Sequence, residues 1–198
     1  MMNKLVCIVG MTGSGKSVVA DEFVKARYGY LRFGQLTLDE VKKRYGNNPP
    51  EGFEKVEKEI REGFRAKYGM GAFATLNIPK FDELLEKGNA LGDGLYSWTE
   101  YKILKEKYRD KFFVIAVYAP PALRYQRLVN RSKDVKDDPK LRYRSFTLEE
   151  AKSRDFAEIE NIEKGGPIAM ADYTIVNIGD MDEVIKKTKE IIEEIGNK

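Results

Sequence analysis

Residues 10–17 of the chain, Gly-Met-Thr-Gly-Ser-Gly-Lys-Ser, have the residue types and the spacing of a Walker A phosphate loop. In such a loop the glycines allow backbone conformations in which successive N–H groups point at one phosphate. Lys16 would then reach the terminal phosphates of a nucleoside triphosphate, and the Ser17 hydroxyl would bind magnesium. The motif therefore predicts ATP and Mg²⁺ as cofactors. The residues predicted to bind them are Gly10, Thr12, Gly13, Ser14, Gly15, Lys16, Ser17 and Val18.

The sequence on either side of this loop supports the interpretation. The apolar run from Leu5 to Val9 comes directly before it and predicts a buried strand, and a helical pattern begins at Lys16. The start of a helix suits an anion because its N–H groups are unpaired and its dipole is positive there. The alternative is an ordinary glycine-rich turn with a solvated lysine, which explains the spacing and the flanks less well.

Other elements must bring further side chains to the loop. Apolar runs predict four more strands, at residues 30–33, 90–91, 114–118 and 173–176. Helical periodicity predicts helices at residues 16–27, 121–130, 148–163 and 182–195. This alternation indicates an α/β fold with a mostly parallel sheet and helices on both faces. Residues 37–86 contain no strand pattern and predict a helical insertion, with breaks near residues 47–50 and 68–71.

The composition excludes several kinds of chemistry. The 198 residues include no histidine, which excludes Ser-His-Asp hydrolysis and histidine-bound zinc. The chain has a single cysteine, Cys7, which excludes an internal disulfide. A net charge of +3 spread along the chain does not favour a nucleic-acid partner. No apolar run approaches the roughly 20 residues of a membrane span. We therefore expect a cytoplasmic protein, either a monomer or a weak homo-oligomer.

Two other classes of nucleotide-binding protein fit the sequence poorly. A GTPase switch would carry a D-x-x-G motif, but residues 93–96 read Asp-Gly-Leu-Tyr, and no N-K-x-D motif is present. A motor or AAA-type ATPase would be longer and would show an acidic pair at the end of a strongly apolar strand. The sequence therefore favours a small-molecule kinase.

Several segments outside the loop carry a resemblance to a known group. Residues 126–131 (QRLVNR), 147–154 (TLEEAKSR) and 171–179 (ADYTIVNIG) resemble the corresponding stretches of dephospho-coenzyme A kinases and of a related archaeal family of nucleotide-kinase-like proteins. The insertion is similar to that of the archaeal family in residues 40–44, 67–74 and 92–97. The resemblance implies one P-loop kinase domain over residues 1–198, with a three-layer, nucleoside-monophosphate-kinase-like fold. It also implies that residues 37–86 are a substrate-binding insertion and that residues 127–155 are an arginine-bearing lid.

The resemblance implies roles for individual residues. Arg127 and Arg131 would lie at the start of the lid as catalytic cations, and three more arginines could close over the phosphates: Arg142, Arg144 and Arg154. Such cations suit phosphoryl transfer, in which negative charge spreads over the moving group. Asn177 would lie beside the adenine. The alternatives are that Arg127 and Arg131 are solvated partners of nearby acids such as Asp134, and that Asn177 is a turn residue.

Asp93 is the best acidic candidate, because it ends a short strand that should lie beside the phosphate loop. Its carboxylate could hold a water bound to Mg²⁺ or orient the acceptor hydroxyl, and the alternative is an ordinary Asp-Gly turn. Two residues depart from the related families. Gln35 replaces an acid after the second strand, and Tyr96 stands where the archaeal relatives often have arginine. An amide binds a hydroxyl but cannot act as a base.

The insertion gives less information about the acceptor. Arg61, Arg65 and Lys67, with Phe64 and Tyr68, could line an acceptor site, although an amphipathic helix with its charges in solvent explains the same pattern more simply. We predict an ATP- and Mg²⁺-dependent kinase for a small nucleotide-like acceptor, with dephospho-coenzyme A and nucleoside monophosphates as candidates. The alternatives are a regulatory ATP-binding protein with little transfer activity and a polynucleotide end-kinase.

Overall fold

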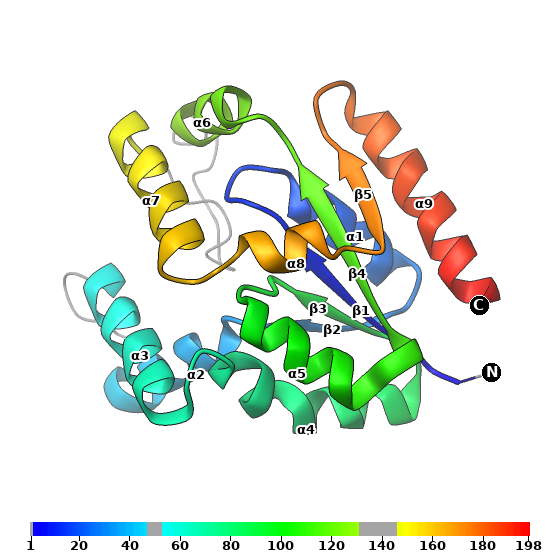
Figure 1. Cartoon of the computed structure of the whole chain (residues 1–198), viewed down its shortest axis with the longest axis horizontal. Helices are drawn as coiled ribbons and strands as arrows, with labels where there is room; N and C mark the ends of the chain where they lie inside the picture. The colour runs from blue at the N-terminus through cyan, green and yellow to red at the C-terminus, as the bar shows by residue number, and fades with distance from the viewer. Residues whose placement is uncertain (1, 47–52, 131–145) are drawn as a thin grey trace.

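A computed structural model describes residues 2–46, 53–130 and 146–198 of the chain. Its centre is a parallel sheet of five strands in the order β2-β3-β1-β4-β5 (Figure 1). The strands are β1 (Leu5–Val9), β2 (Gly29–Arg32), β3 (Ala90–Asp93), β4 (Phe112–Tyr118) and β5 (Tyr173–Val176). The central strand, β1, is buried along its whole length, as its continuous apolar run predicts.

Helices cover both faces of this sheet. Val6 and Ile8 of β1 face a core shared with α1 (Lys16–Lys25) and α9 (Met181–Asn197). The alternate residues of β1 face a second core shared with α4 (Ala72–Lys87) and α5 (Trp98–Tyr108). Successive side chains of a strand point to opposite faces, so one apolar strand supplies two cores. The predicted three-layer α/β fold with a parallel sheet is confirmed.

The insertion is helical, as its lack of a strand pattern predicts. It contains α2 (Gln35–Tyr45), α3 (Phe53–Tyr68) and α4, and the break between α3 and α4 lies at the predicted glycine-rich turn. The other predicted break, near residues 47–50, falls outside the described residues. Ile60 of α3 is 3% exposed, and Phe64 packs edge-on against Phe73 of α4 with ring centroids 5.8 Å apart. The apolar side of α3 therefore packs inward, as predicted for an amphipathic helix.

Helix α5 was missed by the sequence reasoning. It begins with a capping box, in which the Ser97 hydroxyl accepts a hydrogen bond from the Glu100 N–H and the Glu100 carboxylate accepts one from the Ser97 N–H. Trp98 and Tyr101 stack at 5.0 Å between ring centroids on the core side of this helix. The apolar residues of α5 form only a narrow stripe among its lysines and glutamates, so the sequence shows little helical periodicity there.

Three helices follow β4: α6 (Pro121–Asn130), α7 (Leu148–Glu160) and a short α8 (Gly165–Ala169). The predicted lid, residues 127–155, falls partly outside the described residues. Helix α7 begins with a capping box formed by Thr147 and Glu150. In the described part of the chain, no helix is both long enough and apolar enough to span a membrane.

Candidate active site

The phosphate loop joins β1 to α1, where the sequence predicts it. Gly13 and Gly15 have φ angles of +86° and +98°, a region that other residues rarely adopt. A Cβ on Gly13 would lie 2.9 Å from the Arg124 carbonyl oxygen, and one on Gly15 would collide with the Asn177 side chain. Both positions therefore need glycine, for backbone conformation and for space.

Several donors of this loop are available to a ligand. Within the described residues, the backbone N–H groups of Gly13, Gly15, Lys16 and Ser17 have no hydrogen-bond acceptor. Lys16 and Ser17 open α1, whose first N–H groups have no partner inside the helix, and no side chain caps it. The loop thus presents unpaired donors and the positive end of a helix dipole, and these fit the phosphates of a nucleotide.

Lys16 folds back onto the loop, where its Nζ donates hydrogen bonds to the carbonyl oxygens of Gly10 (2.8 Å) and Met11 (3.0 Å). Burial and the nearby charge of Lys164 lower the pKa of Lys16 from 10.5 to about 7, although Glu158 and Asp93 act in the opposite direction. Because the charged form of Lys16 is unfavourable in these surroundings, a bound anion such as a phosphate would stabilise it.

Two predicted residues from distant segments meet at the loop. The Asn177 side chain, just after β5, donates a hydrogen bond to the Ser14 carbonyl oxygen (2.9 Å). Its own side-chain and backbone oxygens accept hydrogen bonds from Arg127 Nη2, at 3.1 and 3.2 Å. Arg127 Nη1 is buried with no partner among the described residues. The structure therefore joins Arg127 to the phosphate loop through Asn177, whereas Arg131 falls outside the described residues, as do Arg142 and Arg144.

Arg124 of α6, which the sequence did not single out, connects the phosphate loop to α7. Its guanidinium makes a bidentate ion pair with Asp155 of α7, at 2.7 and 2.5 Å, and also donates to the Thr12 carbonyl oxygen (3.1 Å). Both side chains are almost fully buried. We call this contact the Arg124–Asp155 clasp. The two residues lie 31 positions apart, so no local pattern could have paired them.

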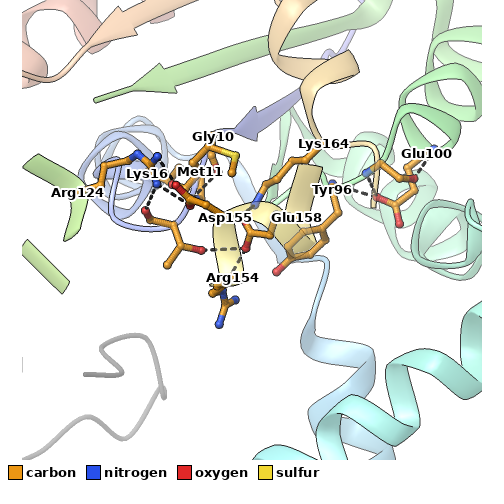
Figure 2. A network of polar contacts seen from close by, with 12 residues as sticks. Gly10, Met11, Lys16, Tyr96, Glu100, Arg124, Arg154, Asp155, Glu158 and Lys164 are labelled. Atoms are coloured by element: carbon orange, nitrogen blue, oxygen red, sulfur yellow. Dashed lines mark hydrogen bonds and ion pairs between the residues drawn. The ribbon is translucent and has the colours of Figure 1, made fainter. Parts of the chain in front are cut away.

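A second unpredicted residue, Glu158 of α7, carries a buried negative charge beside the loop (Figure 2). Its Oε1 accepts hydrogen bonds from the Thr12 hydroxyl (2.9 Å) and from Arg154 Nε (3.1 Å), and its Oε2 accepts one from Lys164 Nζ (2.7 Å). Burial alone would raise the pKa of Glu158, but Lys164, Arg154 and Lys16 outweigh it and hold this pKa at about 2. Glu158 is therefore ionised at any physiological pH.

Of the two predicted metal ligands, Ser17 lies in the first turn of α1 and Asp93 lies on the strand next to β1. Asp93 ends β3 and is in register with Ile8 of β1, one strand away from the loop. Its Oδ2 accepts a hydrogen bond from the Tyr30 hydroxyl (2.7 Å). Within the described residues, no group of three acidic, cysteine or histidine residues could hold a metal. A hydroxyl, a carboxylate and the phosphates of a nucleotide are oxygen ligands of the kind that Mg²⁺ prefers.

A cavity of about 590 Å³ opens beside the loop, between the insertion and α7. The wall includes Thr12 of the loop, Tyr96 and Phe73, and five basic and three acidic side chains. The basic ones are Arg32, Lys58, Arg61, Arg65 and Arg154, and the acidic ones are Glu57, Glu62 and Glu158.

Some residues singled out in the sequence lie elsewhere. The Gln35 side chain donates a hydrogen bond to Asp39 one helical turn further along α2 (2.9 Å), and Gln35 does not line the cavity. Lys67 and Tyr68, at the end of α3, are exposed and contact each other. Of the proposed basic wall, Arg61 and Arg65 line the cavity.

The sequence of this chain resembles those of known proteins. A family model described as an AAA domain matches residues 6–156. The short chain and the missing acidic pair do not predict a match to an AAA domain. The UPF0200 protein of Thermococcus gammatolerans is 34% identical over 193 residues, which cover 96% of this chain and 95% of that protein.

Solved structures share the fold at low sequence identity. A shikimate kinase from Acinetobacter baumannii, in complex with shikimate, aligns with a TM-score of 0.56 and 19% identity over 98% of this chain and 94% of its own. A dephospho-CoA kinase from Campylobacter jejuni aligns with a TM-score of 0.52 and 16% identity over 98% of both chains. These likenesses show a P-loop kinase fold. The sequence match over nearly the full length of both proteins shows that the chain belongs to the UPF0200 protein family.

Proposed function

We propose that this protein is an ATP- and Mg²⁺-dependent phosphotransferase that acts on a small, anionic, nucleotide-like acceptor. The observation that carries the proposal is that Thr12 of the phosphate loop forms part of the wall of the 590 Å³ cavity. A donor phosphate held by the loop would therefore lie next to an acceptor in the cavity. That adjacency is the first requirement for direct transfer between two bound molecules.

The proposal assigns roles to residues of the phosphate loop and to residues around it. The unpaired N–H groups of the loop and Lys16 bind the phosphates, and Ser17 and Asp93 hold the metal or a water bound to it. MgATP supplies the phosphoryl group and an ion that neutralises its charge. Lys16 turns from the carbonyl oxygens of Gly10 and Met11 to the phosphates, and Arg154, on the cavity wall, adds a positive charge. Arg127 acts from the nucleotide side, through its contact with Asn177.

The charge of the cavity supports an anionic acceptor. Three of the basic side chains on the wall are paired with acids on the same wall, as Arg61–Glu57, Lys58–Glu62 and Arg154–Glu158. The wall as a whole carries five basic side chains against three acidic ones, and Arg65 Nε is buried without a hydrogen-bond partner in the described part of the chain. Dephospho-coenzyme A and nucleoside monophosphates carry phosphates that suit such a wall.

A transfer assay tests the proposal. We would incubate the full chain with γ-labelled ATP and Mg²⁺ and with each of a panel of acceptors: dephospho-coenzyme A, AMP, CMP, UMP, shikimate and gluconate. We expect a labelled product from a phosphate-bearing acceptor, and neither ATP binding nor product with Lys16→Ala. Tight ATP binding by Lys16→Ala would refute the loop assignment. ATP binding by the wild type without transfer to any acceptor would favour the regulatory alternative.

A further inference from the structure

One carboxylate connects the phosphate loop to the cavity. Of the three acidic side chains on the cavity wall, Glu158 is the one with a hydrogen bond to the loop, through the Thr12 hydroxyl (2.9 Å). Glu57 and Glu62 both lie on α3, across the cavity, and are paired with cations of that helix. Glu158 therefore lies at the boundary between the two binding regions, where an acceptor hydroxyl must meet the phosphoryl group.

Two other polar side chains near the site, those of Asp93 and Gln35, already have hydrogen-bond partners. Asp93 accepts a hydrogen bond from Tyr30 and does not line the cavity. Gln35, at the position after β2, is bonded to Asp39 along its own helix. In the described residues, the place after β2 thus offers no carboxylate to an acceptor, and α7 offers one from the opposite wall.

Glu158 can still accept one more hydrogen bond. A carboxylate has about four lone-pair positions. Three are occupied, two on Oε1 by Thr12 and Arg154 and one on Oε2 by Lys164. The remaining position is on Oε2. Three donors and an almost complete lack of exposure fix the carboxylate in place.

We propose that, for an acceptor phosphorylated on a hydroxyl such as dephospho-coenzyme A, Glu158 is a catalytic residue that accepts a hydrogen bond from that hydroxyl and aims its oxygen at the γ-phosphorus. This inference rests on the proposed function. In the reaction the bond between the acceptor oxygen and the γ-phosphorus forms, and the bond from that phosphorus to the bridging oxygen breaks. The electron pair of the broken bond stays on ADP, and the hydroxyl proton leaves to water. The low pKa of Glu158 suits orientation of the hydroxyl more than storage of its proton.

Three variants separate this role from a structural one. Glu158→Gln keeps the shape of the side chain but removes its charge, and it leaves Lys164 buried without a counter-charge. Lys164→Met removes that cation alone. The double variant, Glu158→Gln with Lys164→Met, restores the balance of charge without restoring the carboxylate. For each variant we would measure the melting temperature, the Kd for MgATP and the rate of transfer to the acceptor that the wild type phosphorylates best on a hydroxyl. Transfer by the wild type only to the phosphate of a nucleoside monophosphate would overturn the assignment of Glu158.

We expect Glu158→Gln to lower kcat by about 100-fold or more, the usual scale for loss of an acid–base or orienting group, with the Kd for MgATP changed by less than about threefold. The double variant should recover melting temperature but not kcat, and Lys164→Met should keep kcat within about tenfold. Recovery of kcat in the double variant would show a structural role for Glu158 and would overturn the proposal. So would an equal loss of kcat in Lys164→Met, or a loss of MgATP binding in Glu158→Gln.

The wild type in the same assay separates failure of the role of Glu158 from failure of the proposed function. If the wild type transfers phosphate and Glu158→Gln does so equally well, the assignment of Glu158 fails and the proposed function stands. If the wild type transfers phosphate to no acceptor on the panel, the proposed function fails, and the role of Glu158 fails with it.

Discussion

The lowered pKa of Lys16 predicts that the stability of the protein depends on pH in an unusual direction. The unfolded chain keeps this lysine protonated up to about pH 10.5, whereas the folded protein releases the proton above about pH 7. Between these values the unfolded state binds more protons, so Lys16 makes the free energy of unfolding rise with pH. Each pH unit in this window contributes about 1.4 kcal/mol.

The window between pH 7.5 and pH 9.0 gives a measurable difference. Over these 1.5 units the stability of the wild type should rise by about 2 kcal/mol relative to Lys16→Met, which has no proton to lose at this position. The comparison with Lys16→Met cancels other groups that titrate at high pH, such as Cys7 and Tyr108, whose pKa values burial raises. The assay is urea unfolding of both proteins at both pH values, without nucleotide.

The same experiment contains its own check. Saturating MgATP should abolish the difference, because the phosphates return an opposite charge to Lys16 and raise its pKa again. Parallel pH profiles for the wild type and Lys16→Met without nucleotide would refute the reasoning, since they would show that neither burial nor Lys164 affects the charge of Lys16.

Three further predictions test other parts of the site. Gly15→Ala should abolish ATP binding in isothermal titration, since alanine is strained at a φ of +98° and its Cβ would collide with Asn177; unchanged affinity would contradict this loop geometry. Arg124→Met should lower the free energy of unfolding by about 3–5 kcal/mol, because it leaves Asp155 as a buried, unpaired charge, and denaturant titration would measure this loss. Arg65→Gln should raise the KM for the acceptor about tenfold and leave the KM for ATP unchanged, and equal changes in both constants would argue against a cavity-side role.

The parts of the site that the sequence predicts are those built from neighbours in the chain. The phosphate loop is complete within residues 10–17, and the apolar runs that become β1, β4 and β5 are visible without any tertiary information. The sheet is parallel because helices separate its strands, and this too follows from the order of the elements. Asn177 was placed at the nucleotide by resemblance, and the structure puts its side chain against Ser14.

The residues that sequence reasoning missed depend on contacts between distant segments. Glu158 looks like any exposed acid of a charged helix, and only the return of α7 to the loop brings it to Thr12, 146 residues earlier. Lys164 follows a helix in a polar turn but is 2% exposed, because Glu158 compensates its charge. One signal was available: Asp155 and Glu158 are three residues apart, so both point from the same side of α7.

The Arg124–Asp155 clasp constrains which wall of the cavity can adjust to a ligand. Helix α7 is tied to the phosphate loop by this buried pair and by Glu158, so it cannot swing outward without separating desolvated charges. Across the cavity, α3 is held mainly by apolar packing around Ile60 and Phe64, and its pair Lys58–Glu62 is exposed to water. Packing of this kind tolerates small sliding motions. If the proposed transfer takes place here, adjustment to acceptors of different size would therefore fall to α3, while α7 would stay fixed to the phosphate loop.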